Sequence, residues 1–349
     1  MDKDLKILLK NTLLAQALGD AFGYIVEFDK WESIKSMYGN NGLIYEPCKL
    51  ELVATDDTQM ALFCLEGIIN AQKKAEERGV KVEDPTDELY KSFLDWNKTQ
   101  DIYHRADKNN ENSSGLIAYE ELHQRRAPGN TCLSALGSKR KGTIKNPIND
   151  SKGCGGIMRV TPIAFFAKNI DDAFDWGAKQ AAITHGHPEG YLSAGMYSAI
   201  AYELIHNTND IFKAISKAEI VLQDYPKSEK MLDVVNKTVW ASKHSEGLQN
   251  NSLTTELGEG WVGEEAFAVA VYCAVTSTTF KEVLEKSANH SGDSDSTAML
   301  AAGLWYLSNR DESFLQDAKY VDLTSCILKY LDVKLDDSVI LSEKYNPRK

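Results

Sequence analysis

The amino-acid sequence predicts an all-α fold, a compact single-domain orthogonal helical bundle. Apolar residues recur at helical spacing along most of the 349 residues, whereas the two-residue alternation that is typical of strands is scarce. No regular repeat divides the chain, and hydrophobic residues make up 43% of it, which is enough for a sizeable core. We therefore expect residues 1–349 to form one domain of packed helices.

The first helix is expected over residues 4–19, where Leu5, Leu9 and Leu13 recur on one face. Residues 19–23 (GDAFG) are expected to end it, because their glycines indicate a C-cap and a turn; the alternative is a close approach of another segment. The further expected helices cover residues 57–72, 85–98, 171–183, 188–206, 209–223, 228–244, 263–276, 279–289 and 296–308.

Two stretches are less regular. Residues 103–150 are rich in polar side chains, so we expect surface loops with one or two short helices, close to the functional site. A last helix is expected over residues 323–331, followed by a short extended tail.

Composition excludes several classes of protein. The formal net charge of −12 argues against coating of nucleic acid or binding to a membrane surface, since both partners are polyanionic. The N-terminal residues show no signal peptide, and no run of about 18 uncharged apolar residues could span a membrane. The six cysteines form no C-x-x-C pair, so we expect a reducing, cytoplasmic setting.

Two acidic, hydroxyl-rich clusters each precede an apolar helical run. They are residues 55–58 (TDDT) and residues 291–297 (SGDSDST). Their oxygen atoms are the hard ligands that Mg²⁺, Ca²⁺ or Mn²⁺ prefers, and the four aspartates would raise one another's pKa if no cation lay between them. We therefore predict that the two clusters meet in space and bind two divalent cations.

Helix capping is the alternative explanation of these clusters. Ser, Thr and Asp are common N-caps, and acidic residues favour the positive end of the helix dipole. A cap needs one such residue, however, and each cluster supplies three or more. This surplus favours a metal site.

The order of several short motifs resembles the ADP-ribosylglycohydrolase family, which includes the dinitrogenase reductase-activating glycohydrolase. The likeness extends from about Leu5 to Tyr306, and each motif alone is a weak signal. The motifs are GDAFG at 19–23 with Glu27, TDDT at 55–58, RAPGNT at 126–131, GGIMRVTP at 155–162, THGHP at 184–188, GWVGEEA at 260–266 and SGDSDSTA at 291–298.

The resemblance implies an all-α domain with a binuclear metal site at the floor of a cleft. It implies two Mg²⁺ ions, with Mn²⁺ as the alternative metal. The implied metal ligands are Thr55, Asp56, Asp57, Asp293, Asp295 and Ser296. Glu27, Asp56 and Asp57 are the implied catalytic groups. The implied activity is removal of ADP-ribose from modified proteins, most often from an arginine side chain.

The glycine-rich loop is expected to bind the diphosphate of such a substrate. Gly155 and Gly156 allow close approach of the backbone, whose amides, with those of Ile157 and Met158, would donate to phosphate oxygens. Arg159 would add positive charge. The alternative is a structural turn with Arg159 in a surface ion pair.

Three further positions bear on the substrate. His185 is implied to lie beside it, although a packing or capping histidine is an alternative. Trp261 is expected either to line the cleft or to lie in the core. The family often has asparagine or another polar residue near Cys154 and glycine at the position of Ser291, and it often has threonine at that of Ser296. The change at Ser296 keeps a hydroxyl ligand, whereas the other two put substrate preference in doubt.

In the expected reaction, a water activated by the metals attacks the anomeric carbon of the ribose, and a carboxylate takes its proton. An alternative function is an immunity or binding protein that neutralises an ADP-ribosyltransferase toxin by contact. Another alternative is hydrolysis of a small ADP-ribose conjugate.

Overall fold

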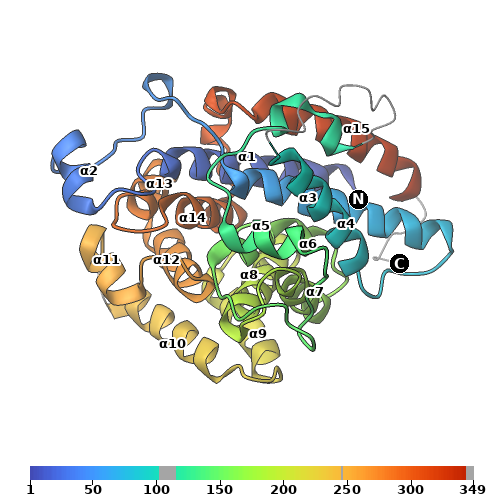
Figure 1. Ribbon diagram of the computed structural model, residues 1–349. Helices are drawn as coiled ribbons and strands as arrows, with labels where there is room; N and C mark the ends of the chain where they lie inside the picture. Colours follow the sequence, from blue (N-terminus) through green and yellow to red (C-terminus); the bar gives the residue numbers. More distant parts are fainter. Residues whose placement is uncertain (102–114, 245–246, 343–349) are drawn as a thin grey trace.

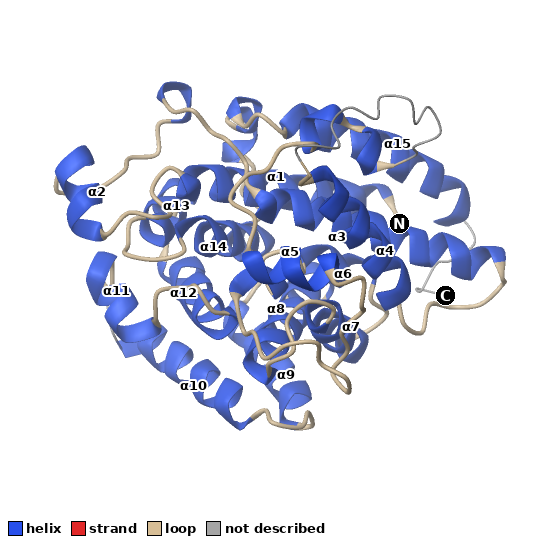
Figure 2. Cartoon of the chain, in the orientation of Figure 1, coloured by secondary structure: helices blue, strands red, loops and turns tan. Residues whose placement is uncertain are grey.

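The fold is built from α-helices joined by loops, as expected from the sequence. The computed structural model describes residues 1–101, 115–244 and 247–342, with side-chain surroundings up to residue 335. No strand occurs among these residues, and the only β-type pairing in them is two isolated bridges (Figure 2). The helices are α1 (Lys3–Tyr24), α2 (Trp31–Tyr38), α3 (Asp56–Glu77), α4 (Thr86–Thr99), α5 (Asn130–Gly137), α6 (Thr161–Phe166), α7 (Ile170–Ala182), α8 (Pro188–His206), α9 (Ile211–Gln223), α10 (Glu229–His244), α11 (Asn250–Leu257), α12 (Gly263–Thr276), α13 (Phe280–Ala288), α14 (Ser294–Asn309) and α15 (Thr324–Ser342).

The most buried helix is α14, which lies in the middle of the molecule (Figure 1). Every residue from Ser294 to Leu307 is buried, because the helix packs against α1, α8, α12 and α13. Such a helix shows little amphipathic pattern, since all of its faces contact protein. The buried apolar side chains around it form one connected core. The helices α10 and α11, which also contribute side chains to this core, lie along the edge farthest from α15 (Figure 1).

The first helix does not end at residue 19, as the sequence predicted, but continues through the GDAFG segment to Tyr24. Its two glycines allow the backbone of α14 to approach. A Cβ atom at Gly19 would lie 2.4 Å from the carbonyl oxygen of Ala298, and one at Gly23 would lie 2.1 Å from that of Ser294. The alternative reading, close approach of another segment, is therefore correct. This contact places residues 20–27 beside the start of α14.

The less regular stretches are only partly described. Of the polar residues 103–150, those up to 114 lie outside the described residues, and the others include α5 and two short 3₁₀ turns, Leu116–Ala118 and Glu120–Leu122. The last helix continues to Ser342 instead of giving way to an extended tail, and residues 343–349 lie outside the described residues. Among the described helices, none combines the length and the apolar character that crossing a bilayer requires.

Candidate metal centre

The two acidic clusters meet at the first turns of α3 and α14. The hydroxyl of Ser296 donates a hydrogen bond of 2.7 Å to Oδ2 of Asp57, a residue 239 positions earlier in the chain. All six predicted ligands are buried, with 0–4% of their surface exposed. These side chains are Thr55, Asp56, Asp57, Asp293, Asp295 and Ser296. The structure therefore brings together the residues that the sequence predicted would converge.

Glu27 completes the cluster from the segment after α1. Its carboxylate, with those of Asp293 and Asp295, forms a group whose nearest oxygens all lie within 4.8 Å of one another. Glu27 is only 7% exposed, and its Oε2 atom has no hydrogen-bond partner in the described structure. A buried carboxylate oxygen without a partner is costly, so its placement is the one expected of a cation ligand.

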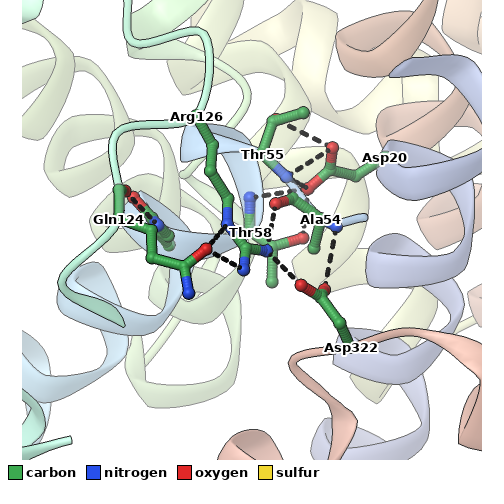
Figure 3. Close-up of polar contacts among 8 residues, drawn as sticks. Asp20, Ala54, Thr55, Thr58, Gln124, Arg126 and Asp322 are labelled. Carbon is green, nitrogen blue, oxygen red and sulfur yellow. Dashed lines mark hydrogen bonds and ion pairs between the residues drawn. The ribbon is translucent and has the colours of Figure 1, made fainter. Parts of the chain in front are cut away.

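Asp20, on α1, supports the candidate centre, although the sequence did not predict it among the site residues. Its carboxylate accepts from the backbone amide of Thr55 at 2.9 and 3.1 Å, and from that of Thr58 at 3.1 Å (Figure 3). It also accepts from both threonine hydroxyls. Asp20 thereby fixes the first turn of α3, which carries Asp56 and Asp57. The signal in the sequence is an aspartate between two glycines, Gly19 and Gly23, which by themselves predict a turn.

Arg126, in the RAPGNT motif, holds the segment before α3 from the other side. Its guanidinium donates to the carbonyl oxygen of Ala54 at 2.8 Å and pairs with Asp322 at 2.6 Å (Figure 3). Gln124 accepts from the same guanidinium at 2.7 and 3.1 Å. The Arg126 carbonyl oxygen in turn accepts from the backbone amide of Asp56 at 3.1 Å. The motif therefore supports the candidate metal ligands without belonging to them.

The acidic groups raise one another's pKa. Burial and the charge of Asp295 raise the pKa of Glu27 to about 11 and that of Asp20 to about 7. The same two causes raise the pKa of Asp56, Asp57 and Asp293 well above its usual value. Cations within the cluster would reverse this effect, because an adjacent positive charge favours the ionised carboxylate.

The donor set fits hard divalent cations. Carboxylate and hydroxyl oxygens dominate it, and they are the ligands of Mg²⁺ and Mn²⁺ rather than of copper or a structural zinc. One softer group lies nearby, since the Cys154 thiol is adjacent to Asp293 and Ser296 and its pKa is raised by burial and by the Asp293 charge. The residues that would hold the cations are Asp56, Asp57, Asp293 and Asp295, with Glu27 beside them.

The glycine-rich loop forms a 3₁₀ turn, Cys154–Gly156, next to this centre. The backbone amides of Ile157 and Met158 both donate to the Cys154 carbonyl oxygen, at 2.9 and 3.2 Å, so the turn itself uses them. Within the described residues, the Gly155 and Gly156 amides have no such acceptor. These two glycines therefore remain candidates for phosphate binding, whereas the amides of Ile157 and Met158 do not.

Arg159 does not fit either expectation, a phosphate ligand or a surface ion pair. Its side chain is 0% exposed, and its guanidinium lies 4.2 Å from the centre of the Phe93 ring. The guanidinium donates to Gln180 and to Thr184, which hold it inside the core. His185, also expected near the substrate, is 1% exposed and lies below the loop, where a Cβ atom at Gly155 would be 2.9 Å from its Cε1 atom.

Two aromatic side chains lie at the surface near the centre. Trp261 is 39% exposed, so it is not a core residue, and it stacks on Phe28 with ring centroids 6.1 Å apart. Phe28 directly follows Glu27, and the Trp261 carbonyl oxygen accepts from the Cys154 amide at 3.1 Å. That the centre lies at the floor of a cleft stays a prediction.

The chain resembles known proteins in both sequence and fold. The sequence profile of the family described as ADP-ribosylglycohydrolase matches residues 1–305. A solved structure titled "ADP-ribosylglycohydrolase-related protein complex" is similar with a TM-score of 0.60 and 17% sequence identity, over 95% of this chain and 97% of that one. No curated protein sequence matches the chain.

The structural likeness, at this low identity, shows the fold alone, whereas the sequence profile identifies the family. The match covers most of the chain and includes the segments that carry Glu27, Asp56, Asp57, Asp293 and Asp295. The chain therefore belongs to the ADP-ribosylglycohydrolase family and is a hydrolase of the glycosidase type.

Proposed function

We propose that this protein removes ADP-ribose from modified proteins in a reaction that needs divalent cations, and that the bond it cleaves joins the ribose to an arginine side chain. The observation that carries the proposal is the convergence of the two acidic clusters with Glu27, whose buried Oε2 atom lacks a partner. Two Mg²⁺ ions, or Mn²⁺ ions, would bind there. When bound, the cations supply Lewis acidity to the ribose hydroxyls and to a water molecule.

The protein's own carboxylates would transfer the proton and stabilise the charge that develops during the reaction. A water oxygen forms the new bond at the anomeric carbon as the bond to the guanidine nitrogen breaks. The guanidine leaves as the neutral base and then takes up the proton that the water gave to a carboxylate. Glu27 is the proposed acceptor of the water proton, because its carboxylate is the one with a free, buried oxygen. Asp56 and Asp57 stabilise the positive charge that develops on the ribose.

The amides of Gly155 and Gly156 are the proposed donors to the diphosphate. They lie beside the centre, since the Cys154 thiol contacts Asp293 and Ser296. The binding of an anion by free backbone amides is common at such turns. The described residues and the comparisons do not support a toxin as a partner.

The experiment is a panel of substrates with matched variants. ADP-ribosylated arginine peptide, ADP-ribosylated serine peptide and a small ADP-ribose conjugate are each incubated with Mg²⁺, Mn²⁺ or EDTA, and release of ADP-ribose is measured. We expect release from the arginine peptide with metal and none with EDTA. Asp293→Asn should lower release by roughly 100-fold or more, since it removes an anionic ligand. Asp332→Asn, at an exposed position on α15, is the control and should keep full activity.

The outcomes separate the alternatives. Release from the serine peptide or the small conjugate alone would replace the proposed substrate but keep the hydrolase. Unchanged release by Asp293→Asn, or undiminished release in EDTA, would contradict the proposed centre itself. Glu27→Gln should retain Mg²⁺ binding better than Asp293→Asn while losing turnover, as expected of a proton acceptor.

A further inference from the structure

The loop before α12, residues 258–262, contacts both the candidate metal centre and the glycine-rich loop. On one side, the Glu259 carbonyl oxygen accepts from the Asp293 amide at 2.8 Å. On the other side, the Trp261 carbonyl oxygen accepts from the Cys154 amide at 3.1 Å. The position of this loop therefore determines how the backbone of Asp293 lies relative to the glycine-rich loop.

The loop packs closely on the start of α14. A Cβ atom at Gly260 would lie 2.7 Å from Cγ2 of Thr297 and 3.3 Å from Cβ of Asp293. One at Gly292 would lie 2.0 Å from the Glu259 carbonyl oxygen. Gly260 has a φ of +86°, which glycine adopts without strain. Because packed backbones leave no free space between them, a displacement of the loop would also displace the backbone of Asp293.

Glu265, in the first turn of α12, holds this loop. Its Oε2 atom accepts from the Glu259 amide at 3.0 Å and from the Gly260 amide at 3.3 Å. A Cβ atom at Gly258 would lie 2.3 Å from Cγ of Glu265, so the loop folds directly over this side chain. Both amides precede Val262, the N-cap residue of the helix, so these bonds fix the loop and do not cap α12.

Glu264, the adjacent residue, contacts the segment before the glycine-rich loop. Its carboxylate pairs with Nζ of Lys152, and the Gly263 amide donates to the Lys152 carbonyl oxygen at 2.8 Å. The helix α12 itself packs against α14 (Figure 1). The first turn of α12 therefore fixes two segments, one that leads to Asp293 and one that leads to Cys154.

A favourable charge at the helix N-terminus is the alternative explanation of Glu265. Acidic residues in a first turn stabilise a helix by up to about 1 kcal/mol through its dipole. That effect needs only the negative charge, whereas the bonds to the Glu259 and Gly260 amides need an acceptor oxygen at this place. Glutamine keeps the oxygen and lacks the charge, so it distinguishes the two explanations.

We propose that Glu265 is a positioning residue for the candidate metal centre. By holding residues 258–260, it keeps the Glu259 carbonyl oxygen against the Asp293 amide and thereby orients the Asp293 carboxylate toward a divalent cation. Groups that support a metal ligand commonly affect metal affinity in this way. The inference rests on the proposed function for the cation. The path of hydrogen bonds from Glu265 to Asp293 does not depend on it.

The first experiment follows backbone amides of the full-length, metal-free protein by hydrogen–deuterium exchange and mass spectrometry. In Glu265→Ala, the amides of residues 259–260 and of Asp293 should exchange roughly 2- to 10-fold faster, as expected for the loss of one hydrogen bond of ordinary strength. Glu265→Gln, which keeps an acceptor oxygen, should exchange like the wild type. The turn Ser313–Gln316 is the internal reference and should not change. Unchanged exchange at Asp293 in Glu265→Ala would overturn the inference.

The second experiment measures the affinity for Mg²⁺ by calorimetry, at a temperature where every variant is folded. Glu265→Ala should weaken binding roughly 10-fold, the smaller of the losses that follow removal of a group supporting a metal ligand. Glu265→Gln should bind like the wild type. Glu259→Ala is the matched control and should also bind like the wild type, because this exposed side chain lies in the same loop and only its backbone makes the contacts described above.

The outcomes separate the inference from the proposed function. An unchanged Mg²⁺ affinity in Glu265→Ala would overturn the inference, since a merely structural residue would alter stability alone. A Glu265→Gln variant that binds as weakly as Glu265→Ala would overturn it as well, because the charge and not the acceptor oxygen would then matter. A wild-type protein that does not bind Mg²⁺ would contradict the proposed function, and the exchange measured without metal would still decide whether Glu265 holds Asp293.

Discussion

Replacement of Asp295 by asparagine should raise the thermal stability of the metal-free protein and lower that of the protein with bound metal. After burial, the charge of Asp295 is the largest cause of the raised pKa at every other acidic group of the centre. These groups are Asp20, Glu27, Asp56, Asp57 and Asp293. Asparagine removes this charge but retains an oxygen that can accept from the Ser296 amide, which donates to Asp295 at 2.8 Å. The substitution therefore removes the negative charge without removing the hydrogen bond at the start of α14.

Asp20 gives the sign and the scale of the effect. The pKa of Asp20 is about 7 in the folded protein, compared with 3.8 for an unperturbed aspartate. Between these two pH values, the metal-free native state therefore binds a proton that the unfolded state has released. The contribution of Asp20 to stability is full below pH 3.8 and is lost as the pH rises through about 7. A shift of this size corresponds to about 4 kcal/mol. Asparagine at position 295 should remove part of this free-energy cost of ionisation, about 1–3 kcal/mol. The metal-free variant should therefore melt about 1–4 °C higher than the wild type at pH 8.

With bound metal, the wild type should instead be more stable than the Asp295→Asn variant. A cation at 100 times its dissociation constant stabilises the wild type by about 2.7 kcal/mol, whereas the variant lacks a ligand and should gain much less. The assay is thermal unfolding by calorimetry at pH 5.5 and pH 8, in EDTA and in excess Mg²⁺, with Asp332→Asn as the control. The reasoning fails if the variant is less stable than the wild type in EDTA at pH 8 and gains as much stability from Mg²⁺.

Two other substitutions test the contacts that build the centre. Ser296→Ala removes the 2.7 Å hydrogen bond to Asp57 and should lower the free energy of unfolding by about 1–3 kcal/mol, with weaker Mg²⁺ binding by calorimetry; an unchanged Mg²⁺ affinity would separate the hydroxyl from the metal site. Gly23→Ala places a Cβ atom 2.1 Å from the Ser294 carbonyl oxygen and should destabilise the protein by about 1–3 kcal/mol or more in urea unfolding. Gly137→Ala, at the end of α5 with no atom within 4 Å of the added Cβ, is the matched control and should be neutral or slightly stabilising.

The sequence predicted most helices because their apolar residues have a clear helical period. The helix expected over 188–206 has those bounds in α8, and that expected over 296–308 differs from α14 by only a few residues. The short helices α2 and α11 were not predicted, since the eight residues of each hold too few turns to show a period. The convergence of the two acidic clusters was also predicted, because two helix starts held more acidic and hydroxyl groups than their caps require.

The errors arose where tertiary contacts decide the local structure. Glycine usually weakens a helix, so Gly19 and Gly23 indicated a helix end, but here the contact with α14 stabilises a helix that includes them. The contribution of Asp20 was not predicted for the same reason, because it consists of contacts with the first turn of α3. Arg159 was expected to bind phosphate or, alternatively, to form a surface ion pair, although Ile157, Met158 and Val160 around it are all apolar and buried.

The structure favours metal binding over capping as the explanation of the acidic clusters, because it shows which residue of each cluster is the cap. In α3 the cap is Thr55, whose hydroxyl accepts from the Asp57 amide at 3.2 Å. In α14 it is Asp293, which accepts from the Ser296 amide at 3.3 Å. Asp56 and Asp57 are not needed as caps and yet are buried, and the bond that Asp56 accepts from the Gly129 amide is long, at 3.4 Å. Helix dipoles worth about 1 kcal/mol or less do not offset the burial of such charges, whereas divalent cations do.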